Sequence, residues 1–179
     1  MKLLSLLLLC PSLLWAGEGR ELIGKPAPDW SFDHWQNSRP LKLKNFRGKV
    51  VLVRWWTAPN CRYCANTAPA LNQLYRDYHK LGLEIIGAYH HKSDEPLVPK
   101  EIAKQAREFG FQFPVAIDTD WHTVNRWWLE AHDRQFTSVS FLIDRRGVIR
   151  YIHPGGQYAI GDRDFAELKS AIETLLAEK

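Results

Sequence analysis

Short apolar runs alternate along this chain with longer segments in which apolar residues recur every three or four positions. A continuous run of β-branched and aromatic residues over 50–56 predicts a strand buried on both faces. Beyond it, apolar residues recur at helical spacing from Leu71 to Leu81, and Gly82 marks the expected end of that helix. The pattern therefore predicts a buried strand that leads, through a short loop, into an amphipathic helix.

The rest of the pattern predicts further strands and helices and a closing hairpin. Strands are expected at 83–89 and 113–117 and as a hairpin at 138–144 and 148–153, and helices at 100–109, at 121–130 and from Asp162 or Asp164 to Ala177. This order predicts an α/β domain in which a mixed central sheet is flanked by helices on both faces.

A tryptophan pair lies in the predicted helix 121–130, for which Asp120 is the expected N-cap. Because neighbouring helical positions point about 100° apart, we expect that Trp127 and Trp128 do not both face inward. The partly exposed ring is a candidate docking surface for another protein. Core packing with incidental exposure agrees better with the usual behaviour of large aromatic side chains.

Length and charge limit the class of protein. The chain has 179 residues and a formal net charge of +4, from 24 basic and 20 acidic residues. This length fits one globular domain with a core of its own. An excess charge so small and so dispersed argues against nucleic acid as the main partner.

The first 16 residues differ from the rest of the chain. Met1 and Lys2 precede an apolar run that ends at Trp15, before the small residue Ala16. This order is typical of a signal peptide, so we expect 1–16 to be cleaved and 17–179 to be an exported, periplasmic domain. The alternative is an uncleaved anchor, although the run falls short of the roughly 20 apolar residues that a membrane span needs. We expect no span in the mature chain.

Removal of that segment removes Cys10 and leaves Cys61 and Cys64 as the only cysteines. A disulfide across a two-residue gap barely restrains the unfolded chain, so it makes a poor structural crosslink. The pair follows the buried strand and opens the helix, where unpaired N–H groups and the helix dipole favour an anion. We therefore interpret Cys61 as the attacking thiolate and Cys64 as the resolving thiol of a redox pair.

A zinc site is the alternative use of two cysteines at this spacing, and it needs two further ligands. His90, His91 or His153 would have to supply them, and their spacing matches no zinc template. We therefore expect neither a metal nor another cofactor. We expect His90 and His91 to begin a solvated loop, with proton transfer at the active site as the alternative role.

The residues around the cysteines resemble a known family. The stretch GKVVLVRWWTAPNCRYC at 48–64 resembles the redoxin group of the thioredoxin-like superfamily, and most of all its exported TlpA/ResA-like thiol–disulfide oxidoreductases. Further matches are Pro69-Ala70-Leu71, the segment 141–149 and the lead-in 24–29. The resemblance implies a thioredoxin-like fold over 17–179. It also implies disulfide exchange with a partner protein that has thiols or a disulfide, supported by an upstream redox protein.

This chain departs from that family beside the cysteines. Family members usually have a cis-proline near the position of Ser138, so substrate docking or metal exclusion is expected to differ here. Thioredoxins bury an acidic residue at the position of Arg54, and their connection from the strand to the first cysteine is one residue shorter. The residues expected to flank the redox pair are Arg54, Trp56, Pro59, Arg62, Tyr63 and Ser138.

Two of these flanking residues are cationic. Arg62 lies between the cysteines in the sequence, and Arg54 is expected behind them. Both would favour a thiolate and hence the reduced form, which would make the pair more oxidising. The alternative is that both guanidinium groups point to solvent or pair with carboxylates elsewhere.

Three other functions compete with disulfide exchange. A peroxiredoxin-like thiol peroxidase has a site that resembles Pro-x-x-x-Thr-x-x-Cys, whereas here Thr57 lies four residues before Cys61 and Pro59 follows it. A thiol-binding module for copper or haem maturation resembles proteins with a wider C-x-x-x-C spacing and a late histidine, which this chain does not match. A non-enzymatic binding domain leaves the spacing of the cysteines unexplained.

Overall fold

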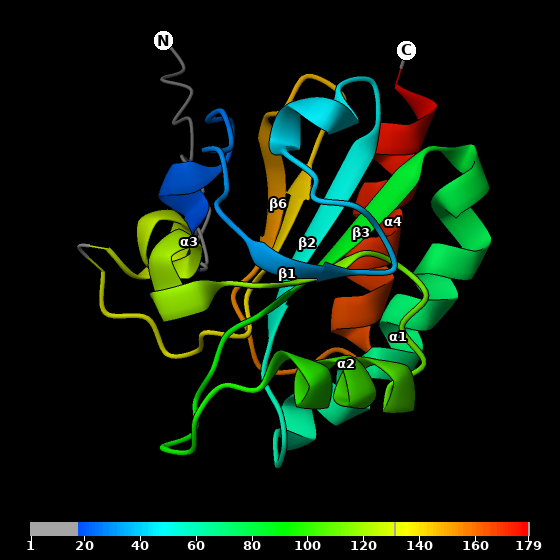
Figure 1. Ribbon diagram of the computed structural model, residues 1–179. Helices are drawn as coiled ribbons and strands as arrows, with labels where there is room; N and C mark the ends of the chain where they lie inside the picture. Colours follow the sequence, from blue (N-terminus) through cyan, green and yellow to red (C-terminus); the bar gives the residue numbers. More distant parts are fainter. Residues whose placement is uncertain (1–17, 131, 179) are drawn as a thin grey trace, which may run out of the picture.

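A six-stranded sheet forms the centre of the protein in the computed structural model, which describes residues 18–130 and 132–178 (Figure 1). The predicted signal segment 1–16 lies outside the described residues. The strand order is β1-β4-β3-β2-β5-β6; β2, β3 and β4 run parallel and the other neighbours antiparallel, which confirms the predicted mixed sheet. The strands are β1 (Asp33–Gln36), β2 (Val50–Trp56), β3 (Leu83–Tyr89), β4 (Val115–Ile117), β5 (Ser140–Ile143) and β6 (Ile149–His153).

Helices join most of these strands. The predicted helix that ends the chain begins after Asp162, whose carboxylate accepts a hydrogen bond from the Phe165 backbone N–H at 2.7 Å. Within the described residues, no helix is long and apolar enough to cross a membrane. The helices are η1 (Arg20–Leu22), η2 (Leu43–Phe46), α1 (Arg62–Tyr78), η3 (His79–Leu81), α2 (Pro99–Glu108), η4 (Thr119–Trp121), α3 (His122–Val124), η5 (Asn125–Leu129) and α4 (Arg163–Ala177).

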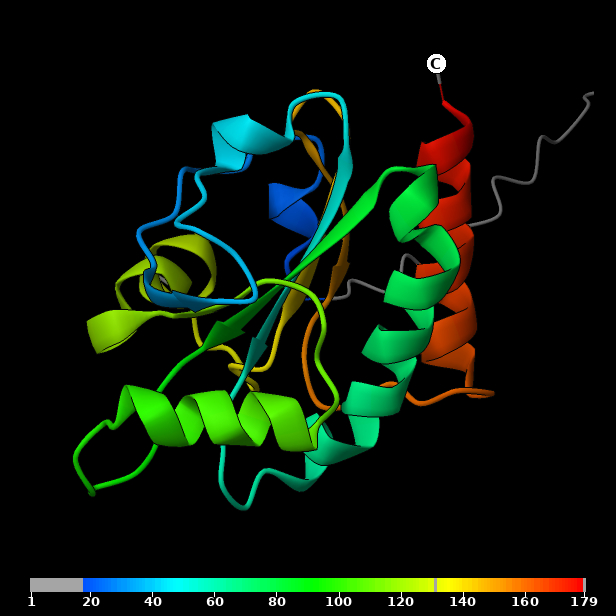
Figure 2. The same ribbon diagram turned by 45° about the vertical axis from the view of Figure 1, so that its right-hand side comes forward.

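The sheet separates two apolar clusters. The α1-side cluster lies between the sheet and α1, α2 and α4, and Figures 1 and 2 both show α1 and α4 side by side on this face. The α3-side cluster lies on the opposite face, beneath α3, η5 and the segment 30–46. Alternate residues of β2 enter the two clusters, so both faces of this strand need apolar side chains. This explains the continuous apolar run at 50–56.

The predicted helix at 121–130 is divided into a 3₁₀ turn, an α-turn and a π-helical turn. Asp120 does not cap it, and this prediction was wrong. The capping residue is Asp118, whose two carboxylate oxygens accept hydrogen bonds from the backbone N–H groups of Thr123 at 2.8 Å and Val124 at 2.7 Å. The structure selects Asp118 because β4 ends directly before it, next to Trp55, whose indole N–H donates to the same carboxylate at 2.9 Å.

Trp127 and Trp128 are both buried, so the prediction that one would be partly exposed was wrong. The ring centroid of Phe141 lies 5.3 Å from that of Trp127 and 5.9 Å from that of Trp128. Residues before β1 cover the pair from outside, since a Cβ added to Gly19 would come within 2.6 Å of the Trp128 ring, and the ring centroids of Trp30 and Trp127 are 6.3 Å apart. A helix covered from two sides buries neighbouring positions, and the two rings therefore offer no docking surface.

Candidate active site

Cys61 and Cys64 form a disulfide at the first turn of α1, directly after the loop that leaves β2. Their Cα atoms are 5.3 Å apart, within the usual range for a disulfide. Cys61 is the N-cap residue of α1, and its sulfur accepts a hydrogen bond from the Cys64 backbone N–H, with nitrogen and sulfur 3.2 Å apart. A thiolate at Cys61 therefore lies where the helix N-terminus stabilises negative charge.

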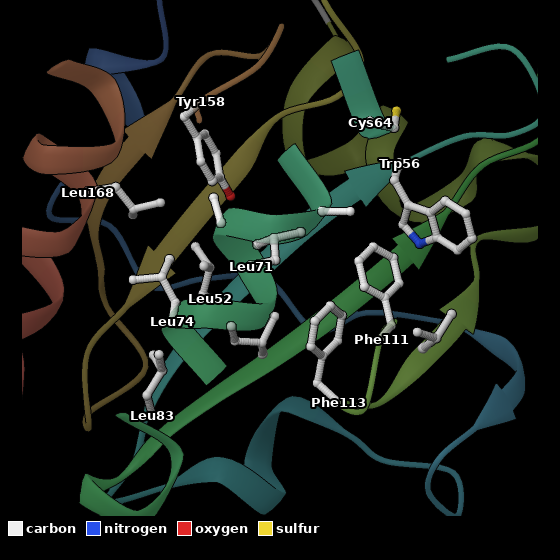
Figure 3. Close-up of a cluster of buried hydrophobic side chains, with 14 of the residues drawn as sticks. Leu52, Trp56, Cys64, Leu71, Leu74, Leu83, Phe111, Phe113, Tyr158 and Leu168 are labelled. Carbon is white, nitrogen blue, oxygen red and sulfur yellow. The ribbon is translucent and has the colours of Figure 1, made fainter. Parts of the chain in front are cut away.

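The two sulfur-bearing side chains differ in access. Cys64 is 3% exposed and belongs to the α1-side cluster, and Figure 3 shows it beside Trp56. Its sulfur lies 3.5 Å from the Thr57 backbone N–H. Cys61 is only partly buried and packs against the edge of that cluster. An external thiol can therefore reach Cys61, while Cys64 faces the interior.

Trp56 lies beneath the disulfide and supports it from inside. Its ring meets Tyr89, Phe109 and Phe111 edge to face, with centroids 5.1, 5.7 and 5.5 Å away. Gly87 lets the indole lie close to β3, since a Cβ there would come within 3.3 Å of Trp56 Nε1. Trp56 is buried and thus flanks the pair from the core rather than from the surface.

Three of the predicted flanking residues surround Cys61 at the surface: Pro59, Arg62 and Tyr63 are exposed. A hollow of about 260 Å³ includes Pro59 and Cys61 among its lining residues, and another of about 510 Å³ includes Cys61, Tyr63 and Gln157. The peptide bond between Ala58 and Pro59 is cis. Cys61 is therefore accessible from two sides.

A second segment, Phe136–Ser138, lies against the mouth of the site. The Tyr63 ring packs edge to face on Phe136 with centroids 5.8 Å apart. Ser138, at the position of the family's cis-proline, is buried, and its hydroxyl oxygen accepts a hydrogen bond from the Gly156 backbone N–H at 3.1 Å. A proline there would lack this hydroxyl, so Ser138 joins the segment to the loop at 155–157 in a way that proline does not.

Arg54 is buried on the α1 side of the sheet, 1% exposed. Its guanidinium donates to the Gly156 carbonyl oxygen at 2.7 Å and to the Ser140 hydroxyl at 3.3 Å. It also lies over the Tyr158 ring, with Cζ 5.2 Å from the centroid. Arg54 thus neither points to solvent nor pairs with a carboxylate of the described residues. Arg62, in contrast, is exposed, which agrees with the alternative that an arginine beside the cysteines points to solvent.

His90 is fully buried, so its predicted place in a solvated loop was wrong. Its backbone N–H donates to the Trp56 carbonyl oxygen at 3.0 Å, which extends the pairing of β2 with β3 by one residue. Its Nε2 lies 2.7 Å from the Thr137 hydroxyl, and its ring meets Trp121 edge to face. Burial lowers the pKa of His90 to about 3, so the imidazole is neutral at neutral pH.

Sequence reasoning missed Phe136, Ser140 and Tyr158, which approach the site from distant parts of the chain. The one signal for them was the dipeptide Gly155-Gly156, because adjacent glycines indicate a close approach of backbone to other groups. Within 18–130 and 132–178, no three His, Cys, Asp or Glu side chains gather as metal ligands would.

Comparisons with known proteins agree with this site. A sequence model of the AhpC/TSA family matches residues 23–152. Thiol-disulfide oxidoreductase ResA of Geobacillus thermodenitrificans is 31% identical over 133 residues, which cover 74% of this chain and 70% of that protein. Protein DipZ of Mycobacterium tuberculosis is 33% identical over 130 residues, 70% of this chain, but the match spans only 18% of DipZ.

Solved structures share the fold. The crystal structure of a candidate thiol:disulfide interchange protein DsbE from Chlorobium tepidum superimposes with a TM-score of 0.69, over 87% of this chain and 98% of that one, at 24% sequence identity. This similarity confirms the thioredoxin-like fold that the residues at 48–64 led us to expect.

Proposed function

This chain belongs to the AhpC/TSA family, and from that premise we propose that it is a thiol–disulfide oxidoreductase whose Cys61 and Cys64 exchange disulfides with partner proteins outside the cytoplasm. The observation that carries the proposal is the unequal access of the two cysteines. Cys61 is reachable and caps α1, whereas Cys64 is buried behind it. This arrangement suits one attacking and one resolving thiol.

In the oxidising direction, a partner thiolate attacks the Cys61 sulfur, the bond between Cys61 and Cys64 breaks, and Cys64 leaves as a thiolate. A second partner thiolate then attacks the partner sulfur of this mixed disulfide and releases Cys61 as a thiolate. The partner has lost two electrons and gained a disulfide, and the pair has gained both electrons. The reverse sequence reduces a partner disulfide, with Cys61 as the attacking thiolate and Cys64 as the resolving thiol.

A trapping experiment tests this proposal. In Cys64→Ser, the mixed disulfide between Cys61 and a partner cannot be resolved, so we expect covalent complexes that disappear on reduction. Cys61→Ser is the matched control and should capture almost no partner, because Cys64 is buried. Equal capture by both variants, or by neither, contradicts the assignment of roles. Rapid thiol-dependent peroxide consumption by the purified wild type would instead favour the peroxidase alternative.

Export is proposed because the segment 1–16 has the order of a signal peptide and because a CxxC pair of this kind suits an oxidising compartment. An upstream redox protein that restores the pair after each exchange is part of this proposal. N-terminal sequencing of the protein recovered from the periplasm tests the first point, with Gly17 as the expected first residue. Recovery of the whole protein in the cytoplasm contradicts it.

A further inference from the structure

Arg54 is a buried cation whose contacts are all with uncharged groups. These are the Gly156 carbonyl oxygen, the Ser140 hydroxyl and the face of the Tyr158 ring. Burial lowers the pKa of Arg54, but an arginine begins so high that the guanidinium stays protonated. A buried charge without an opposite charge beside it is costly.

No ion pair within the described residues includes Arg54, and the remaining residues contain no Asp or Glu. The titratable groups near it are Tyr158, His90 and His153. Burial raises the pKa of Tyr158 and lowers the pKa of both histidines, so all three are neutral at neutral pH. In the disulfide form, therefore, nothing close to Arg54 supplies a negative charge.

Arg54 lies on the face of the sheet that α1 covers, over the ring of Tyr158, which belongs to the same apolar cluster as Cys64. Its side chain leaves β2 on the same face as Trp56, which packs in the cluster that contains Cys64. Thr57, whose N–H is 3.5 Å from the Cys64 sulfur, follows Arg54 by three residues, about 10 Å along a strand. On the other side, Tyr158 donates its backbone N–H to the Thr67 hydroxyl of α1 at 3.3 Å. Tyr158 and Cys64 belong to the same apolar cluster, and Figure 3 draws both side chains.

From this geometry we propose that Arg54 is a positioning residue whose buried charge stabilises the Cys64 thiolate and makes the pair more oxidising. The inference rests on the proposed exchange function and concerns how the same site is tuned. When the disulfide accepts two electrons from a partner dithiol, Cys64 leaves as a thiolate and supplies the opposite charge that Arg54 lacks. Arg62 contributes less, because it is exposed and water and salt screen its charge.

The expected size of the effect follows from the backbone separation of about 10 Å between Arg54 and Thr57, the residue that contacts the Cys64 sulfur. A unit charge about 10 Å away, at an effective dielectric constant of about 20, changes the ionisation of a thiol by roughly tenfold. The same factor enters the equilibrium between the disulfide and the reduced pair at a pH where Cys64 is ionised, and the equilibrium is therefore measured there. A tenfold change corresponds to about 30 mV for this two-electron couple.

Redox equilibrium with glutathione tests the proposal on the full-length protein. Arg54→Met removes the charge from a side chain of similar length, and we expect a roughly tenfold more stable disulfide. Arg54→Lys keeps the charge and should stay close to the wild type. Arg62→Gln is the matched surface control and should change the equilibrium less than Arg54→Met. An unchanged equilibrium in Arg54→Met overturns the proposal, as does an Arg54→Lys variant that shifts as far as Arg54→Met.

A second measurement applies even where Arg54→Met does not fold. In the double variant Cys10→Ser, Cys61→Ser, Cys64 is the one thiol left, and we expect thiolate absorbance to report a pKa below the ordinary value of about 8.5. A pKa at or above that value overturns the proposal. A wild-type disulfide that does not equilibrate with glutathione overturns this inference together with the exchange function. If Arg54→Met changes the equilibrium with glutathione as expected but Cys64→Ser traps no partner, only the proposal of exchange with partner proteins is overturned.

Discussion

The backbone N–H of Cys64 points at the sulfur of Cys61, with the two atoms 3.2 Å apart. In the reduced protein, the same N–H is ready to donate to a Cys61 thiolate. The sulfur that an external thiol can reach is thus also the one that the helix N-terminus stabilises.

This relationship predicts selective alkylation. After reduction, brief treatment with iodoacetamide at neutral pH should modify Cys61 first, because it is the more accessible thiol and the better stabilised thiolate. Peptide mapping by mass spectrometry measures the ratio of the two products. The protein unfolded in guanidinium is the control and should show similar labelling of both cysteines. Preferential labelling of Cys64 in the folded protein would contradict the assigned roles.

Asp118 should contribute far more to stability than Asp120. Asp118→Ala removes the acceptor of three hydrogen bonds, from the indole of Trp55 and the N–H groups of Thr123 and Val124. We expect a loss of about 3 kcal/mol in the free energy of unfolding, since each buried donor is left without a partner. Asp120→Ala, at an exposed position two residues later, should cost under about 1 kcal/mol, which comes from its positive φ of 55°, a conformation that Asp adopts more readily than Ala. Urea unfolding followed by tryptophan fluorescence gives both values, and equal losses would favour Asp120 as the cap.

Gly155 should tolerate no side chain. It has φ of 129°, and an added Cβ would overlap the Phe136 side chain, including Cγ at 3.1 Å. Gly155→Ala should therefore destabilise the protein by about 3 kcal/mol and slow disulfide exchange, because Phe136 supports Tyr63 at the mouth of the site.

Gly161→Ala is the matched control for this prediction. Gly161 also has a positive φ, 93°, but nothing lies within 4 Å of an added Cβ. Gly161→Ala should lower the free energy of unfolding by about 1 kcal/mol, from backbone strain alone, and leave the rate of disulfide exchange unchanged. Similar costs for the two variants would show that contact with Phe136 is unimportant.

Stability should fall in acid because of His90. Burial lowers its pKa to about 3 in the folded state, whereas the unfolded state has the ordinary value of about 6.5. Between these values the unfolded chain binds a proton that the folded protein does not. The free energy of unfolding is therefore unaffected by His90 above about pH 6.5. Below that pH, protonation of His90 in the unfolded chain lowers it by about 1.4 kcal/mol per pH unit.

Comparison of variants isolates this contribution from that of other titrating groups. His90→Gln should unfold with a shallower dependence on pH than the wild type between about 6.5 and 4. Urea unfolding at several pH values measures these slopes. Parallel profiles for wild type and His90→Gln would show that His90 does not titrate on unfolding.

Much of the site was predictable because it is local in sequence. Strand β2 and helix α1 follow from their own apolar spacing, and Cys61 and Cys64 lie at the junction between them. The helix N-terminus that stabilises Cys61 needs no distant residue. The order of strands and helices, with the late hairpin, was likewise sufficient to predict a mixed sheet with helices on both faces.

The tertiary structure decided the surroundings of Arg54, His90 and the tryptophan pair. Arg54 depends on Gly156 and Tyr158, about a hundred residues away, and His90 depends on Thr137. Burial of Trp128 and Trp127 likewise depends on Gly19 and Trp30, about a hundred residues earlier, which cover them. The chain by itself determined the redox pair, since periodicity and helix capping act between neighbouring residues. Burial and charge compensation depend on which distant segments meet, and these govern how the pair is tuned.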